Sequence, residues 1–369
     1  MQTYDVLIVG AGPSGSTCAR KLCQSGLRTL VIDRKDFPRD KPCAGWITPQ
    51  VVQLLELDVN EYSREHTCQP ITGFRCGVIG GTEIEIDYQE PISFGIRRSE
   101  FDHFLLQRSG TEQRLNETVD RIERHGGNWV INDRYRAPIL VGAGGTHCPV
   151  ARMLGAKANS SRSTVVAQEV EFRIRGEMSA QKVMGNIPVL YFCRDLLGYG
   201  WCFRKGEYLN IGLGRVDATD FMHHVSQFQE FVTEQGIQCV DVGFPWKGHS
   251  YQLYVGAERK LSAEGVLLLG DAAGLAYAQS GEGIRPAVES GGIAAGVIIA
   301  AHGNYTPENL SRYQSLLEQR LGKPIRASLL NQLPTSWLAS LGSCMLASPW
   351  FSRHIVLDRW FLHRADKAG

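Results

Sequence analysis

The 369-residue chain lacks three features that would assign it to a class at once. Its formal net charge is +1, so composition gives no case for a nucleic-acid partner. No uninterrupted apolar run reaches the roughly 18 residues that a membrane span requires. The chain enters a predicted core strand by Asp5, so we expect no secretory signal. These absences predict a cytoplasmic globular protein.

The ten cysteines include no CxxC pair and are spread over the whole chain. A disulfide framework and a zinc ribbon both require clustered cysteines, so neither is expected. No third ligand stands at a zinc spacing from His147 and Cys148, and we predict no metal site.

A glycine-rich segment close to the N-terminus is the first positive signal. The run Val6-Leu-Ile-Val9 is typical of a buried parallel strand, and Gly10-Ala-Gly12-Pro-Ser-Gly15 follows it directly. In a GxGxxG turn the first glycine permits the tight turn, the second lets the backbone approach a pyrophosphate, and the third lets the helix pack on the strand. A helix is predicted over 16–25, with Gly26 as its cap. The helix N-terminus would attract the phosphates.

The strand predicted next, over 29–33, ends in a carboxylate, Asp33. An acid at this place in a dinucleotide fold binds the ribose hydroxyls, and it would repel a 2′-phosphate. A strand, a glycine turn, a helix and a second strand with its acid together predict an adenine-dinucleotide site.

A second glycine-rich segment lies near the other end of the chain. Val266-Leu-Leu-Leu269 reads as a buried strand, Gly270-Asp271 follows it, and Ser280-Gly281-Glu-Gly283-Ile284 precedes a predicted helix. A carboxylate there can accept hydrogen bonds from sugar-alcohol hydroxyls. Small residues at a helix N-terminus suit a flat ring that carries partial negative charge. The two segments together predict a flavin dinucleotide, FAD, held along its length.

Strand patterns dominate the stretches 70–96 and 164–214, whereas 218–236 and 287–301 read as helices. We therefore expect an α/β fold with a Rossmann-like FAD-binding domain, an inserted β-rich substrate domain and a C-terminal helical segment. The expected bounds are 1–70, 97–160 and 264–302 for the FAD-binding domain, 71–96 and 161–263 for the substrate domain, and 303–369 for the helical segment.

These elements resemble the glutathione-reductase-type flavoproteins of the p-hydroxybenzoate hydroxylase fold, in which a GxGPxG element and a late GDAA element both bind FAD. A middle GADG element of that group reads Gly142-Ala-Gly144-Gly145 here, with glycine in place of the usual aspartate. Lys41-Pro-Cys43-Ala-Gly45 is similar to the KPCGG element of geranylgeranyl reductases. The stretch 198–214 is similar to their YxWxFPKG…NVGLG element, and Arg98-Ser-Glu-Phe-Asp102 matches their RxxFD helix. The paired-tryptophan WxWxIP element of flavin halogenases is missing.

The motifs and the resemblance together imply a set of FAD-contacting positions. These are Gly10, Gly12, Pro13, Ser14, Gly15, Asp33, Arg34, Ala44, Gly45, Arg98, Val119, Gly270, Asp271, Gly281, Gly283 and Ile284.

Three residues, Cys43, Tyr191 and Trp201, are candidates for the chemistry. The resemblance brings the Cys43 loop towards the flavin, where a thiol, mostly protonated at neutral pH, would act as a proton donor. The alternative is a packed small hydrophobe. Tyr191, Tyr199 and Trp201 are expected on strands of the substrate domain, as an aromatic face for an apolar or planar substrate or as ordinary core. Lys205 and Asn210 are expected at a hairpin.

The resemblance implies an FAD-dependent reductase that transfers hydride to a C=C or related unsaturated bond of an apolar, isoprenoid-like substrate. The alternative from the same fold is a monooxygenase or halogenase-like enzyme that acts on an aromatic or polyketide-like substrate. A flavin-binding redox sensor is the non-enzymatic alternative. Since no second GxGxxG has its own strand, helix and acid, we expect the electron donor, NAD(P)H or ferredoxin, to bind transiently.

The C-terminal stretch combines aromatic and basic residues, among them Trp337, Trp350, Arg353 and Trp360. Helices of this composition can lie at a membrane surface, cap an apolar tunnel or simply pack on a core. Peripheral membrane contact is therefore one expectation for this segment.

Overall fold

The computed structural model describes residues 1–156, 163–174, 183–237, 244–255, 260–323, 342 and 344–364. The chain forms two compact units, and each contains segments that lie far apart in the sequence. The first unit comprises 1–40, 99–163 and 251–326, and the second comprises 41–98, 164–250 and 327–369.

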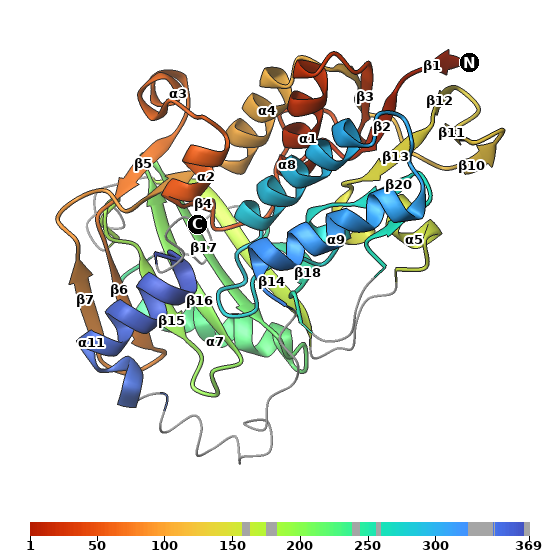
Figure 1. Cartoon of the computed structure of the whole chain (residues 1–369). Coiled ribbons are helices and arrows are strands. Elements are labelled where there is room, and N and C mark those ends of the chain that lie inside the picture. The colour runs from red at the N-terminus through yellow and green to blue at the C-terminus, as the bar shows by residue number, and fades with distance from the viewer. Residues whose placement is uncertain are drawn as a thin grey trace. The chain divides into compact units, whose positions relative to one another are not determined.

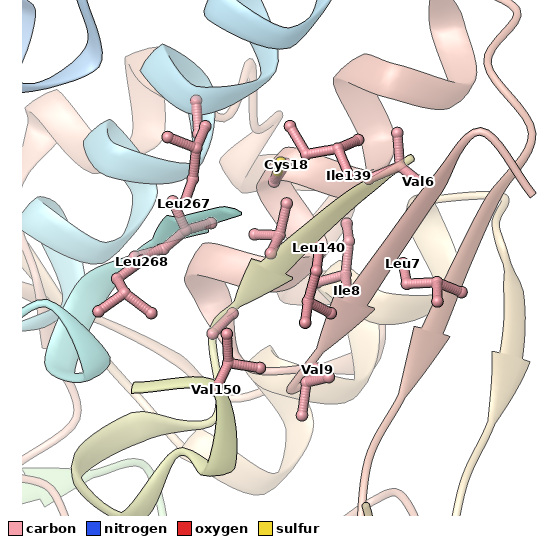
Figure 2. Close-up of a cluster of buried hydrophobic side chains, with 14 of the residues drawn as sticks. Val6, Leu7, Ile8, Val9, Cys18, Ile139, Leu140, Val150, Leu267 and Leu268 are labelled. Carbon is pink, nitrogen blue, oxygen red and sulfur yellow. The ribbon is translucent and has the colours of Figure 1, made fainter. Parts of the chain in front are cut away.

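The first unit is built on a six-stranded, mainly parallel sheet (Figure 1). Its strands are, in spatial order, β19 (Ser262–Ala263), β20 (Val266–Leu268), β13 (Ile139–Gly142), β2 (Val6–Val9), β3 (Thr29–Ile32) and β9 (Glu112–Arg114). Every residue of β2, β3, β13 and β20 is buried, as expected of parallel strands covered on both faces. Figure 2 shows side chains of β2, β13 and β20 in one cluster with Cys18 and Val150.

Helices cover this sheet, and a second sheet completes the unit. The helices are α1 (Pro13–Gln24), α4 (Arg98–Arg108), α5 (Pro149–Met153), α8 (Ile284–Ala300) and α9 (Pro307–Leu321), with short 3₁₀ turns at Gly145–His147 and Gly270–Ala272. The second sheet has the order β1 (Gln2–Thr3), β12 (Tyr135–Ala137), β11 (Asn128–Ile131) and β10 (Ile122–His125). Helices α1 and α8 pack closely because Gly291 has no side chain: an added Cβ would overlap the backbone oxygen of Ser14.

The second unit is built on a seven-stranded mixed sheet (Figure 1). Its strands are, in spatial order, β18 (Lys247–Gln252), β14 (Thr164–Arg173), β17 (Tyr208–Arg215), β16 (Gly198–Lys205), β15 (Val189–Phe192), β6 (Gly73–Val78) and β7 (Glu83–Asp87). A three-stranded sheet of β4 (Trp46–Ile47), β8 (Ser93–Ile96) and β5 (Cys68–Ile71) accompanies it, with α2 (Pro49–Leu54) and α3 (Val59–Glu65).

The large sheet of the second unit has an apolar cluster on each face. One cluster joins Val170, Tyr191 and Ile211 to α7 (Phe221–Glu234). The other joins Phe74, Trp201 and Phe203 to the C-terminal residues Val356 and Phe361. The latter belong to the π-helix Ser352–Phe361, which follows α11 (Pro349–Phe351).

The sequence predicted most of the described elements. The strands expected at 6–9 and 29–33 are confirmed as β2 and β3, and the strand-rich stretch 164–214 contains β14, β15, β16 and β17. Gly26 has φ +84° directly after the cap of α1, as a helix-ending glycine should. Trp337 lies outside the described residues.

Candidate functional site: a dinucleotide cradle and a buried polar cluster

The two glycine-rich segments meet at one edge of the six-stranded sheet. Strands β2, β13 and β20 are adjacent and parallel, so their carboxyl ends lie side by side. Gly10 to Gly15 follow β2, and Gly270-Asp271 follow β20. Ligands of open α/β sheets bind at this edge. The predicted meeting of the two segments is therefore confirmed.

Each glycine of the first segment has a distinct role. Gly10 has φ +112°, and a Cβ there would overlap the carbonyl of Ala143. A Cβ on Gly15 would overlap the carbonyl oxygen of Gly10. Gly12 differs, since its added Cβ would meet only the Arg39 guanidinium, at 3.6 Å. The protein itself thus requires glycine at 10 and 15, whereas the space beside Gly12 is open for a ligand.

Two helices begin at this edge without a capping side chain. The N-cap residues are Gly12 for α1 and Gly283 for α8, and neither offers a side-chain hydrogen bond. The first amides of a helix have no acceptor inside the helix, and the helix dipole makes this end positive. Both termini are therefore suited to groups that carry negative charge, and the placement of the pyrophosphate at α1 and of the flavin ring at α8 stays a prediction.

Asp33 holds the first loop in place. Its carboxylate accepts the Ala11 N–H at 2.8 Å and the Lys35 N–H at 2.9 Å. The loop geometry therefore depends on this acid, and its expected contact with a ribose stays a prediction. Arg34, directly after it, is exposed, and Val119 packs partly on the core of the same unit.

The second segment is equally constrained. Gly270 has φ +53° and donates its N–H to Ser290 Oγ at 3.0 Å, which ties the strand end to α8. A Cβ on Gly283 would lie 3.5 Å from an Asp271 carboxylate oxygen, so Asp271 borders the start of α8. Gly281 also has a positive φ, and a Cβ there would crowd the Tyr251 hydroxyl.

Sequence reasoning missed Arg39, which borders the first loop. Its guanidinium lies 3.3 Å from the carboxylate of Asp102, a fully buried residue, and over the ring of Phe37. A guanidinium fixed in this way beside Gly12 could hold a phosphate. In the sequence, the only indication of this role was the position of Arg39, several residues after Asp33.

The structure also explains Gly144, where the resemblance expects aspartate. An added Cβ at Gly144 would lie 3.2–3.3 Å from Cys148 Cα, Cβ and Sγ. The buried Cys148 thus occupies the space into which a side chain at 144 would project. An aspartate there would require Cys148 to shift.

The remaining predicted residues lie in the second unit. Trp201 crosses β17 where Gly212 leaves room, since a Cβ on Gly212 would overlap the indole. This placement lets Trp201 Nε1 donate to Asn210 Oδ1 at 2.7 Å, and Asn210 Nδ2 donates in turn to the Cys43 carbonyl at 3.3 Å. Cys43 and Trp201 are therefore linked through Asn210. Gly212 is therefore needed for this arrangement, whereas a Cβ on Gly214 would make only ordinary contacts, at 3.6 Å.

Tyr191 lies elsewhere. It belongs to the cluster on the α7 face, stacks edge-on against Phe231 and donates its hydroxyl to Glu83 at 2.8 Å. Trp201 and Tyr199 belong to the opposite face. The predicted single aromatic face is wrong for Tyr191, because neighbouring positions of β15 alternate between faces. Its catalytic role stays an untested prediction.

A buried polar cluster near the Cys43 loop was also missed. Lys205 is fully buried, and its ammonium pairs with Glu171 at 2.5 Å. Burial would raise the pKa of Glu171, but Lys205 and Arg97 outweigh burial and hold that pKa below its usual value. Burial raises the pKa of Glu169 to about 7, although Lys205 opposes this shift. The signal in the sequence was a pair of glutamates, Glu169 and Glu171, on the strand face that also carries Val165 and Ala167.

The fold and the cradle together define an FAD-type dinucleotide-binding protein, and the residues fit that cofactor: the space beside Gly12 is open, and both helix termini are uncapped. Residues 3–193 match the family described as "FAD binding domain". The chain belongs to that family.

Curated relatives narrow the class. The chain is 29% identical over 355 residues to digeranylgeranylglycerophospholipid reductase 3 of Methanosphaera stadtmanae, covering 88% of this chain and 85% of that protein. It is 28% identical to menaquinone reductase of Mycobacterium tuberculosis, covering 86% and 81%. A geranylgeranyl bacteriochlorophyll reductase-like structure from Thermoplasma acidophilum shares the fold, with TM-score 0.75, 20% identity and coverage of 96% and 99%.

The chain is an FAD-dependent oxidoreductase similar to the geranylgeranyl reductases, and these relatives favour the reductase prediction over the monooxygenase alternative. Within the described residues, no helix combines the length and the apolarity needed to cross a membrane.

Proposed function

We propose that the protein reduces a C=C bond of an apolar, isoprenoid-like substrate with reducing equivalents from FAD. The dinucleotide cradle carries this proposal, because both of its helix termini and the Asp33-bound loop suit FAD. Reduced FAD, when bound, supplies the hydride. The alkene would gain that hydride and one proton, and NAD(P)H or ferredoxin would supply the two electrons for the next turnover.

The half-buried aromatic residues Trp46 and Tyr199 of the second unit are the proposed contacts for the substrate. Trp46 stacks on Phe361 with ring centroids 5.4 Å apart and packs against Phe74 at 4.8 Å. Tyr199 contacts Phe361 edge-on at 5.4 Å. Aromatic residues that exclude water would favour an apolar chain and would strengthen electrostatic effects on the reacting bond.

Cys43 is the proposed proton donor. Its thiol is half-buried and accepts the Gly45 N–H at 3.4 Å. A protonated thiol in this loop would give its proton to the carbon that does not receive hydride, and solvent would then restore it.

Replacing Cys43 with alanine is expected to lower kcat by about 10²- to 10⁴-fold, the usual contribution of a positioned acid. FAD content and KM should stay near wild type, because the change removes only one sulfur. Single-turnover kinetics of reduced holoenzyme would measure the effect. Cys68→Ala, which removes another half-buried thiol of the same unit, is the control. Unchanged turnover in the Cys43 variant would remove the thiol from the mechanism.

The product formed under air tests the reaction class. Holoenzyme supplied with an electron donor and polyprenyl alkenes should give saturated products and no hydroxylated ones. Hydroxylated product formed with an equal consumption of oxygen would instead favour the monooxygenase.

The C-terminal helices supply the proposed peripheral contact with a membrane. Trp350 is 64% exposed on α11, and Arg353 follows it with its guanidinium over Tyr88. An exposed indole beside basic residues suits the headgroup region of a bilayer.

Trp350→Ser should weaken binding to anionic phospholipid vesicles roughly tenfold, through lost apolar burial. Phe244→Ser, which also removes an exposed aromatic, should not. Equal vesicle binding by all three proteins would exclude this contact.

A further inference from the structure

Each peptide group around Cys43 and Ala44 is bonded to the rest of the second unit. The Cys43 N–H donates to the Glu169 carboxylate, and its carbonyl accepts from Asn210 Nδ2 at 3.3 Å. The Ala44 carbonyl accepts from Lys205 Nζ at 3.1 Å. The backbone at 43–44 is therefore held by side chains of β14, β16 and β17.

The three side chains that hold the loop are themselves fixed. Asn210 accepts from Trp201 and also donates to Glu169 at 3.2 Å and Glu171 at 3.3 Å. Its amide nitrogen has two hydrogens for three acceptors, so at least one hydrogen is shared. Glu171 pairs with Lys205 and accepts a hydrogen bond from Arg97 Nε at 2.9 Å. Each member is thus oriented by others, which limits its motion.

The loop fits this cluster only with glycine at 45. Gly45 has φ +68°, and its carbonyl accepts the Ile96 N–H at 2.6 Å. An added Cβ would overlap the Ile96 carbonyl oxygen and would lie 2.7 Å from Lys205 Nζ. The lysine therefore packs directly against the backbone that it holds.

Burial makes this arrangement costly. Lys205 and Asn210 are fully buried, and Glu169 is 7% exposed. Buried charges seldom stabilise a fold better than apolar residues of the same size would, so their presence here favours a positioning role.

We propose that Glu169, Lys205 and Asn210 form a peptide clamp that fixes the backbone of Cys43 and Ala44 and thereby sets the direction of the Cys43 thiol. They are positioning residues, since each acts through the loop. The clamp stands on contacts within the second unit, and only its effect on turnover rests on the proposed function.

Alkylation of Cys43 tests the clamp without using catalysis. Holoenzyme is treated with iodoacetamide near pH 8, and modified peptides are quantified over time by mass spectrometry. In Asn210→Leu and Lys205→Met, loss of buried hydrogen bonds should release the loop and speed Cys43 modification about tenfold. The exposed Cys344 of the same chain serves as the internal reference. Arg173→Leu is the control, because it breaks only the exposed ion pair between Arg173 of β14 and Glu207 of the turn that joins β16 and β17.

Hydrogen exchange tests the same contacts in the wild-type protein, so its result does not depend on whether the variants fold. The peptide spanning 41–47 should retain slowly exchanging amides at Cys43 and Gly45. Rapid exchange there, or an unchanged alkylation rate in both folded variants, would overturn the clamp.

Measuring kcat and KM of the same variants distinguishes a failure of the clamp from a failure of the proposed function. Faster alkylation with a lower kcat and an unchanged KM supports both. Faster alkylation with unchanged turnover supports the clamp and contradicts the role of Cys43 as acid.

Discussion

Replacing Gly12 with alanine is expected to abolish FAD binding while the apoprotein stays folded. The new methyl group would contact only the Arg39 guanidinium at 3.6 Å, and the backbone of this N-cap residue has φ −73°, which suits any residue. The same methyl group would occupy the space that a pyrophosphate needs. We expect FAD affinity to fall at least about a hundredfold, which corresponds to ~3 kcal/mol. Titration of apoprotein with FAD, followed by flavin fluorescence, would measure it.

Gly15→Ala is the matched comparison. Its methyl group would overlap the carbonyl oxygen of Gly10 within the protein, so this variant should lose stability itself. We therefore expect Gly12→Ala to lower the affinity for FAD and Gly15→Ala to lower the stability of the fold. If Gly12→Ala bound FAD as tightly as wild type, the cradle would be wrongly placed.

The second large effect is expected at Glu289, in the buried part of α8. Its carboxylate oxygen Oε1 lies 2.9 Å from both Arg285 Nε and Arg320 Nε, and Oε2 accepts the Tyr277 hydroxyl at 3.3 Å. Arg285 and Glu289 are almost fully buried. Glu289→Gln would remove the charge of the carboxylate that pairs with the buried Arg285.

Such a change typically lowers the free energy of unfolding by about 3–5 kcal/mol. Urea denaturation of the apoprotein would measure it. Glu207→Gln provides the control, because it neutralises one partner of an exposed ion pair and should change stability by less than about 0.5 kcal/mol. A loss at Glu289 no larger than at Glu207 would contradict the account of this network.

The dinucleotide half of the site could be predicted from the sequence because its signals are local. A strand, a GxGxxG turn, a helix and an acid follow one another within residues 6–33, and each residue type has one physical reason to stand there. The partner segment at 266–284 could be joined to it because buried parallel strands deliver their ends to one edge.

The part of the candidate site in the second unit depends on strand pairing, which no short stretch of the sequence specifies. The faces of β15 follow from its register with β16 and β6, so Tyr191 could not be assigned to a face in advance. Glu169, Lys205 and Asn210 come from three strands and meet only after those strands pair. Gly144 likewise made sense only once Cys148 was seen to occupy the adjacent space.

A single turnover without oxygen tests the central claim most directly. Holoenzyme is reduced stoichiometrically under argon, mixed with a polyprenyl lipid that has C=C bonds, and followed by flavin absorbance and product mass. The account predicts that the oxidised flavin spectrum returns and that one C=C bond per FAD gains two hydrogen atoms. Flavin that stays reduced until oxygen is admitted, and then yields hydroxylated product, would contradict it.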